Sequence, residues 1–112
     1  MLPKSNRLRK KKDFDRVFKK GKRISENFLI FQFVGNDLDC NRFGFVISKK
    51  VSKKATIRNS LKRKLGGLME YKIAKKKNGI DGVFLVKPGL ETENSVAIKE
   101  IVDKIFKKVG LS

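Results

Sequence analysis

The sequence predicts an α+β fold in which helices cover a small mixed β-sheet. Three segments are rich in β-prone residues (27–34, 42–48 and 83–86), and amphipathic helix patterns precede, separate and follow them. Helix, strand, strand, helix, strand, helix is the resulting order, which is typical of an α+β sandwich. The chain has 112 residues and no linker rich in Gly, Ser or Pro. We therefore expect one domain spanning residues 1–112.

The N-terminal part of the chain is expected to be extended at first and then helical. Residues 1–12 are rich in lysine and arginine, which favours an extended basic segment. Asp13 can cap a short helix, and Gly21 can end it. The apolar face of this helix is formed by three residues at helical spacing: Phe14, Val17 and Phe18.

Two strands are expected next. Residues 27–34 form a nearly continuous β-prone run that closes at the turn 35–37. The second run, 42–48, lies a hairpin's distance further on. We therefore expect these two strands to pair antiparallel.

A long central helix should begin at Ala55 or Thr56. Its apolar stripe is formed by Ile57, Leu61, Leu65 and Leu68. Gly66 and Gly67 each weaken a helix by about 1 kcal/mol relative to alanine, so we expect a bend or an early end there. A solvated basic segment, 72–77, leads to a buried strand at 83–86. A final helix, 95–109, has its apolar face at Ile98, Ile101, Val102, Ile105 and Val109.

The charge of the chain is the strongest indication of function. Lysine and arginine total 29 against 11 aspartates and glutamates, which gives a formal net charge of +18. Charge of this size opposes compactness, so a polyanionic partner that neutralises it is expected. Residues 48–65 alone contain eight cationic side chains.

The central helix is expected to separate these cations from its apolar stripe. At about 100° per residue, Arg58 and Lys62 lie one turn apart beside the stripe, and Asn59 and Arg63 lie one turn apart near the opposite side. No acidic residue occurs between positions 55 and 69. This absence favours phosphate binding over a merely solvated charged face. Four further cations crowd the connection that precedes the helix: Lys49, Lys50, Lys53 and Lys54.

Three phenylalanines are candidates for stacking on unpaired bases. Phe14 and Phe18 share one face of the first helix, and Phe31 lies in the first strand. Exposed aromatic rings are sequence-tolerant platforms for single-stranded nucleic acid. The spacing alone favours the alternative, that the three are core residues, whereas the cations between them favour a solvent-exposed site.

The sequence contains no candidate catalytic or metal site. It has no histidine, and the lone Cys40 has no thiol partner. The nearest approach to an acidic group, Asp81 with Glu91 and Glu93, is interpreted as loop and helix-cap acids. No apolar run reaches membrane-spanning length, and the N-terminus lacks the apolar core of a signal peptide. We expect a cytoplasmic protein without a disulfide framework.

Three segments in register resemble the protein subunit of bacterial ribonuclease P. They are RLR at 7–9 with DFDRVFKKG at 13–21, RFGFVISKK at 42–50 with RNSLKR at 58–63, and DGVFLVKPG at 81–89. The resemblance implies a two-layer sandwich in the order α-β-β-β-α-β-α with a left-handed β-α-β crossover, as in the ribosomal protein S5 domain 2-like fold. It also implies a further early strand near residues 22–25.

The resemblance further implies that an RNA subunit carries out the chemistry with Mg²⁺, removing the 5′ leader from precursor tRNA. It assigns a leader-binding cleft to Phe14, Phe18, Phe31, Lys49 and Lys50. It assigns contact with the RNA subunit to the basic helix and the preceding loop, at Lys53, Lys54, Arg58, Asn59, Lys62 and Arg63. It implies no catalytic residue, protein metal site, membrane contact or obligatory protein partner.

Two positions depart from the pattern of that family, and two other functions stay open. Ser60 stands where a third basic residue is usual, and Gly66-Gly67 replaces a charged, helix-favouring pair. One alternative is a ribosomal or other structural RNA-binding protein with no role in cleavage. The other is a self-sufficient nuclease, which would need clustered carboxylates to hold a divalent metal.

Overall fold

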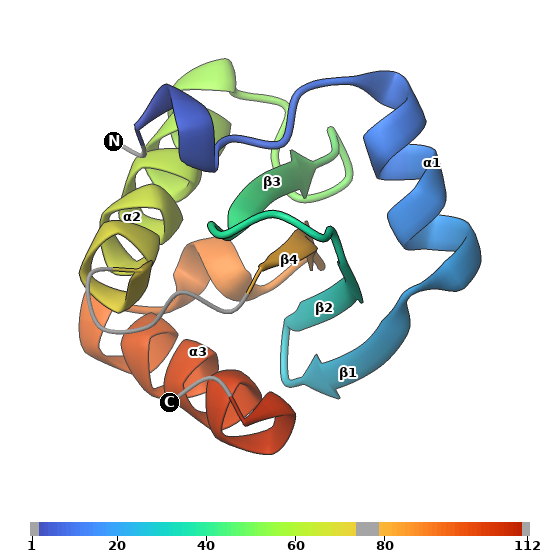
Figure 1. Cartoon of the computed structure of the whole chain (residues 1–112). Coiled ribbons are helices and arrows are strands. Elements are labelled where there is room, and N and C mark those ends of the chain that lie inside the picture. The colour runs from blue at the N-terminus through green and yellow to red at the C-terminus, as the bar shows by residue number, and fades with distance from the viewer. Residues whose placement is uncertain (1–2, 74–78, 111–112) are drawn as a thin grey trace.

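The computed structural model describes residues 3–73 and 79–110, which form a four-stranded sheet with three α-helices (Figure 1). In chain order the elements are η1 (Lys4–Asn6), α1 (Lys11–Lys20), β1 (Lys22–Glu26), β2 (Leu29–Gly35), β3 (Arg42–Ile47), α2 (Ala55–Ile73), β4 (Ile80–Val86), η2 (Leu90–Thr92) and α3 (Ser95–Val109). The α+β class and the α-β-β-β-α-β-α order are confirmed, including the early strand that only the resemblance implied. Of the basic segment expected at 72–77, residues 74–77 lie outside the described part of the chain.

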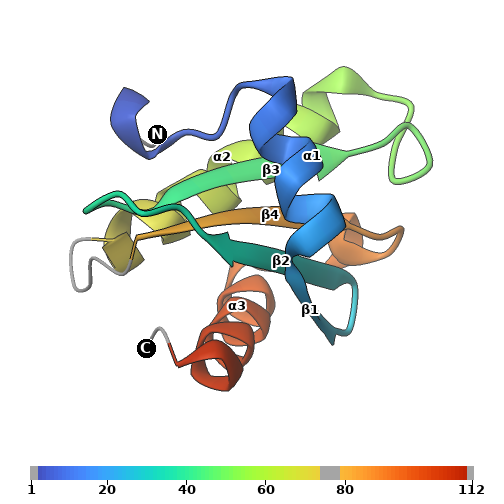
Figure 2. The same ribbon diagram turned by 45° about the vertical axis from the view of Figure 1, so that its right-hand side comes forward.

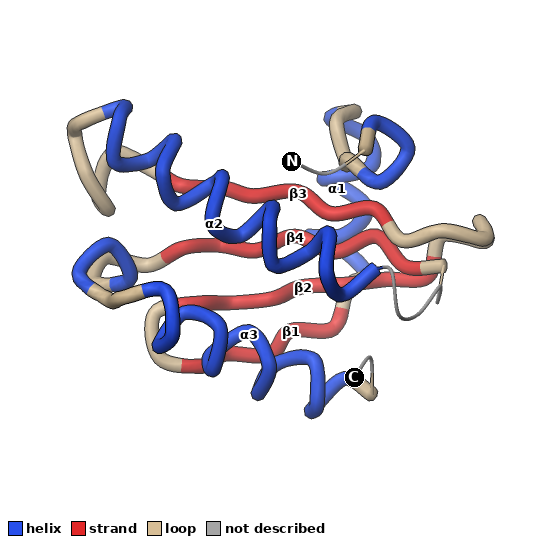
Figure 3. The backbone as a smooth tube through the Cα atoms, turned by 90° about the vertical axis from the view of Figure 1, so that its left-hand side faces the viewer, coloured by secondary structure: helices blue, strands red, loops and turns tan. Residues whose placement is uncertain are grey.

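The sheet has the strand order β1-β2-β4-β3. Strand β4 pairs antiparallel with β2 and parallel with β3, and Phe84 of β4 lies opposite Phe31 on one side and Phe45 on the other. A parallel pair needs a crossover connection, which α2 provides. The crossover from β3 through α2 to β4 is left-handed, as Figure 3 shows.

The expected antiparallel pairing of the strands at 27–34 and 42–48 is wrong. The first of these, β2, pairs antiparallel with β1 and with β4, and β3 pairs parallel with β4. The physical reason is the apolar character of β4, in which six of seven residues are buried. A strand that is buried on both faces is stabilised most by a central position, so β4 lies between β2 and β3.

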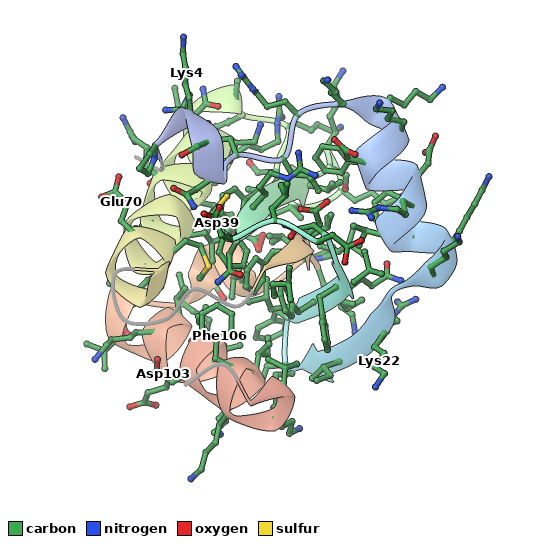
Figure 4. The ribbon with its side chains drawn as sticks, viewed as in Figure 1. Lys4, Lys22, Asp39, Glu70, Asp103 and Phe106 are labelled. Atoms are coloured by element: carbon green, nitrogen blue, oxygen red, sulfur yellow. The ribbon has the colours of Figure 1, made fainter. Side chains whose placement is uncertain are left out.

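Helices lie on both faces of this sheet. Helices α2 and α3 cover one face, and the shorter α1 crosses the other (Figure 2). The face under α2 and α3 carries the main core, in which Phe31 and Phe106 meet edge to face at 5.9 Å. Figure 4 shows Phe106 pointing from α3 toward the sheet. The smaller core under α1 contains Leu8, Val17 and Val83. The expected two-layer sandwich therefore describes the sheet with α2 and α3, and α1 adds a partial third layer.

The start of the chain differs from the expected extended segment. Residues 4–6 form a turn of 3₁₀-helix, and Arg7 then forms a parallel bridge with Phe43, in which the Leu8 N–H donates to the Phe43 carbonyl at 2.9 Å. The N-terminal segment thus lies along the outer edge of β3. Asp13 is not the cap of α1, because Lys10 occupies that position. Asp13 lies in the first helical turn instead, 3.5 Å from Arg42.

The two long helices follow the expected boundaries. Helix α2 continues through Gly66 and Gly67 to Ile73, so the glycines do not end it. Leu61 and Leu65 of its apolar stripe are buried, together with Met69. Helix α3 is capped by Asn94, whose side chain accepts the Ala97 N–H, and by Gly110 in the left-handed conformation.

Candidate nucleic-acid interface

The loop from β3 to α2 presents cations on a well-defined backbone. The Ser48 hydroxyl accepts the Lys50 N–H, and the Ser52 hydroxyl accepts the Lys54 N–H, each at 3.2 Å. These short-range bonds fix the loop without using its lysine side chains. All four lysines are exposed: Lys49, Lys50, Lys53 and Lys54.

Helix α2 extends this cationic surface. Asn59, Lys62 and Arg63 are exposed, whereas Arg58 is half-buried and donates from Nη1 to the Ser52 carbonyl at 2.8 Å. Arg58 therefore ties the loop to the helix and has only part of its guanidinium free for a ligand. Within residues 3–73 and 79–110, neither Lys62 nor Arg63 takes part in an ion pair. Cations without acidic neighbours are available to phosphate oxygens.

Phe14 and Phe18 lie on α1, above the opposite face of the sheet. Their ring centroids are 6.3 Å apart. Phe14 rests on Gly44, since a Cβ atom at that position would lie 2.6 Å from the ring. Phe18 is 42% exposed. Of the two rings, Phe18 is the one with a large surface available for stacking.

Phe31 does not belong to this aromatic pair. It is completely buried on the face under α2 and α3, where its ring lies 4.5 Å from that of Phe84. Successive side chains of a strand point to opposite faces, and Phe31 shares its face with Phe33 instead of with the residues under α1. The assignment of Phe31 to a leader-binding cleft is therefore wrong.

Asp81 holds the α1 side of the molecule together, a role that the sequence analysis missed. Its carboxylate is fully buried in β4 and accepts bonds from Arg16 (2.6 Å), from Arg42 Nε and Nη2 (2.8 and 2.7 Å) and from Asn36 (2.9 Å). Asp81 is thus no loop acid. The sequence signal for this role was the position of Asp81 just before the buried apolar run 83–86, together with Arg42 at the start of another strand.

The environment of Asp81 keeps its carboxylate charged. Burial raises the pKa of the carboxyl, but the hydrogen bonds from Arg42, Asn36 and Arg16 and the charge of Arg42 outweigh burial, and the pKa lies below its ordinary value. The same interaction raises the pKa of Arg42 despite partial burial. Arg16 lies in α1, so the network joins that helix to β3 and β4.

No group suited to binding a metal ion is found in the described residues: nowhere in them do three His, Cys, Asp or Glu side chains gather. Glu91 instead accepts the Gly89 N–H and stabilises the turn after β4. Cys40 is a free thiol. No helix in the described ranges combines the length and apolar character that membrane crossing requires.

Comparison with known proteins gives one consistent result. Residues 2–110 match the family model described as Ribonuclease P. The "Ribonuclease P protein component" of Syntrophomonas wolfei is 39% identical over 111 residues, which covers 99% of this chain and 92% of that protein. The protein of the same name from Synechocystis is 36% identical and covers 98% of this chain and 90% of its own length.

Solved structures show the same fold. The RNase P protein from Thermotoga maritima has a TM-score of 0.82 at 28% identity, covering 91% of this chain and 96% of that one. The Staphylococcus aureus RNase P protein has a TM-score of 0.88 at 22% identity, covering 96% and 98%, and supports the fold alone. The chain therefore belongs to the bacterial ribonuclease P protein family and is the protein subunit of that endoribonuclease complex.

Proposed function

We propose that this subunit binds two RNA segments. The 5′ leader of precursor tRNA binds at α1, and the catalytic RNA binds along the 48–54 loop and α2. The observation that carries the proposal is the exposed cationic surface of that loop and of α2, in which neither Lys62 nor Arg63 has an ion pair among the described residues. In this proposal the RNA hydrolyses the phosphodiester bond, and the protein supplies affinity and neutralises charge.

The leader-binding part of the proposal rests on α1. Phe18 offers a stacking surface, and exposed Lys19 and Lys20 follow it directly. Rings flanked by cations suit a single strand, because bases stack on the rings while the backbone phosphates contact the cations. Lys49 and Lys50, in the turn that follows β3, stay predicted contacts of the leader.

The RNA-subunit part rests on Lys53, Lys54, Lys62 and Arg63, which are exposed. Asn59 is also exposed and adds an amide on the same helix. Arg58 has a dual role in this proposal, since it holds the loop through Ser52 and leaves part of its guanidinium for phosphate. The basic surface is continuous along the chain from the loop into the helix.

Mg²⁺ enters this proposal through the RNA, whose phosphates are suitable ligands for a hard cation that prefers oxygen. No obligatory protein partner is part of the proposal. We place the complex in the cytoplasm, which accords with the free thiol of Cys40.

Replacing Phe18 with alanine is expected to weaken binding of precursor tRNA while leaving mature tRNA binding nearly unchanged. The loss should be about 1–3 kcal/mol, or roughly 5- to 150-fold, if one base stacks on the ring. Equilibrium binding of the reconstituted complex to both RNAs measures the difference. Phe14 is a poorer test residue, because its ring also packs on Gly44 and the smaller core.

Val96→Ala is the matched control, since Val96 is an exposed apolar residue on α3 at 66% exposure. It should alter neither affinity. Equal losses for precursor and mature tRNA in Phe18→Ala would contradict the leader site. Cleavage of precursor tRNA by RNA-free protein, or recovery of ribosomal RNA alone as the bound species, would contradict the wider proposal.

A further inference from the structure

A groove of about 530 Å³ opens at the outer edge of β3, between the N-terminal segment and α2. Figure 1 shows the N-terminal segment passing β3 on its way from the side of α2 to α1. The groove does not include Phe18, but it adjoins that ring, because Phe14 lines the groove and lies 6.3 Å from Phe18. Its lining combines an apolar floor with a cationic rim.

The floor of the groove is aromatic and rigid. Phe45 and Phe14 are half-buried and line it from the two faces of the sheet. The ring of Phe45 is stacked on Phe84 at 5.9 Å and 17°, so its position is fixed by the core. Leu8 and Phe43, which also line the groove, are almost fully buried. Such a floor suits a flat apolar group.

The rim of the groove is positively charged on two sides. Arg9 lies on the N-terminal side, and Lys62 and Arg63 lie on the α2 side. All three are exposed, and none of them has an ion pair in the part of the chain that the structure describes. The ligand that complements this arrangement carries negative charge around a flat apolar centre.

The edge of β3 adds hydrogen-bonding groups to the floor. The Phe43 carbonyl points outward, because it accepts the Leu8 N–H. In an extended strand the N–H and C=O groups of every second residue point to the same side, so those of Phe45 face the same open edge. A donor and an acceptor beside an aromatic floor match the polar edge of a nucleobase.

Gly66 keeps the groove open on the α2 side. It lines the groove, and a Cβ atom built on it would have no neighbour within 4 Å. A side chain at this position would therefore start in open space and extend toward the groove. Gly67 is equally unhindered but does not line the groove. The two adjacent glycines thus provide a blocking position and a matched control.

We propose that this groove binds one unpaired nucleotide of an RNA, with the base against Phe45 and the open edge of β3 and the flanking phosphates at Arg9, Lys62 and Arg63. The volume accommodates a group of this size. The inference rests on the proposed role as an RNA-binding subunit, and it adds a nucleotide site at the β3 edge beside Phe18. The nucleotide belongs either to the leader of precursor tRNA or to the RNA subunit, which share this chemistry.

The first experiment locates the site with adenosine 5′-monophosphate as the probe. In the wild-type protein and in Gly67→Leu, the backbone amide resonances of Gly44 and Phe45 should shift saturably during the titration. In Gly66→Leu those shifts should be lost. Both variants replace glycine with a good helix former, so both should remain folded, with unfolding midpoints at or above that of the wild type. Equal shifts in the two variants would overturn the proposal.

The second experiment identifies the source of the nucleotide. Binding of each variant is measured separately to the RNA subunit and, as the reconstituted complex, to precursor tRNA. Gly66→Leu should bind one of these two RNAs about tenfold more weakly than Gly67→Leu does, and the RNA that is affected is the source of the nucleotide. A loss in neither arm would overturn the groove proposal. Failure of the wild-type protein to promote leader removal by the RNA at low Mg²⁺ would instead overturn the proposed function.

Discussion

Replacing Asp81 with asparagine is expected to lower the free energy of unfolding by about 3 kcal/mol. The buried carboxylate accepts four hydrogen bonds, three of them from Arg16 and Arg42. An amide of the same shape places an N–H donor against an arginine donor, removes the counter-charge of Arg16, and leaves Arg42 with the more distant Asp13 at 3.5 Å. Chemical denaturation of both proteins measures the loss. Asp15→Asn is the control, because Asp15 is exposed on α1, and its effect should stay within about 0.5 kcal/mol.

The difference between wild type and Asp81→Asn should depend on pH. The folded state lowers the pKa of Asp81, so its contribution to stability is fully present above the ordinary aspartate value of about 3.9. The contribution is lost as the pH falls through the lower, folded-state value. Denaturation at about pH 7 and at about pH 3 should therefore show a smaller gap in acid. A gap that stays constant would show that the charge of Asp81 is not the source of its effect.

Removing four cations from the loop and α2 is expected to weaken binding to the RNA subunit on the order of 10³-fold at about 0.15 M salt. The reason is counterion release, since each lost phosphate contact lowers the slope of log K against log salt by about 0.9. The slope should therefore become shallower by about 3.6 units. Alanine also favours helix, so α2 should persist. The variant replaces these residues with alanine: Lys53, Lys54, Lys62 and Arg63.

A control of equal charge separates a specific surface from a general effect of net charge. Four exposed lysines outside the loop and α2 serve this purpose: Lys87, Lys99, Lys104 and Lys107. Their replacement with alanine should change affinity and salt slope far less. Equal losses in both variants would mean that the cations of α2 act only through the total charge of the chain.

Local patterns predicted most elements of the fold. Helix α3, the start of α2 and the buried strand β4 follow from apolar patterns close to them in sequence, whereas the caps of α3 were not predicted. Strand β1 was found only through the resemblance, because Lys22–Glu26 has one apolar residue among five. The pairing of β2 with β4 depends on residues some 50 positions apart, and no local pattern contains that information.

The functional surface could likewise be predicted only where local sequence patterns determine it. Charge runs mark exposed cations reliably, because lysine side chains are rarely buried. The face of a strand on which an aromatic residue lies is decided by packing, so Phe31 could not be separated from Phe14 and Phe18 by spacing. The groove at β3 is composed of three segments distant in sequence, and only the folded chain brings Arg9 close to Lys62 and Arg63.

The excess of positive charge also bears on aggregation, because the sheet has strand edges that are not fully paired. β1 and β3 are the outer strands, and although the N-terminal segment covers part of the β3 edge, the unpaired remainder is a template for strand-to-strand aggregation. With a net charge of +18, copies of the free chain repel one another and this route is suppressed. High salt screens that repulsion. We therefore expect self-association of the free chain to increase with salt concentration.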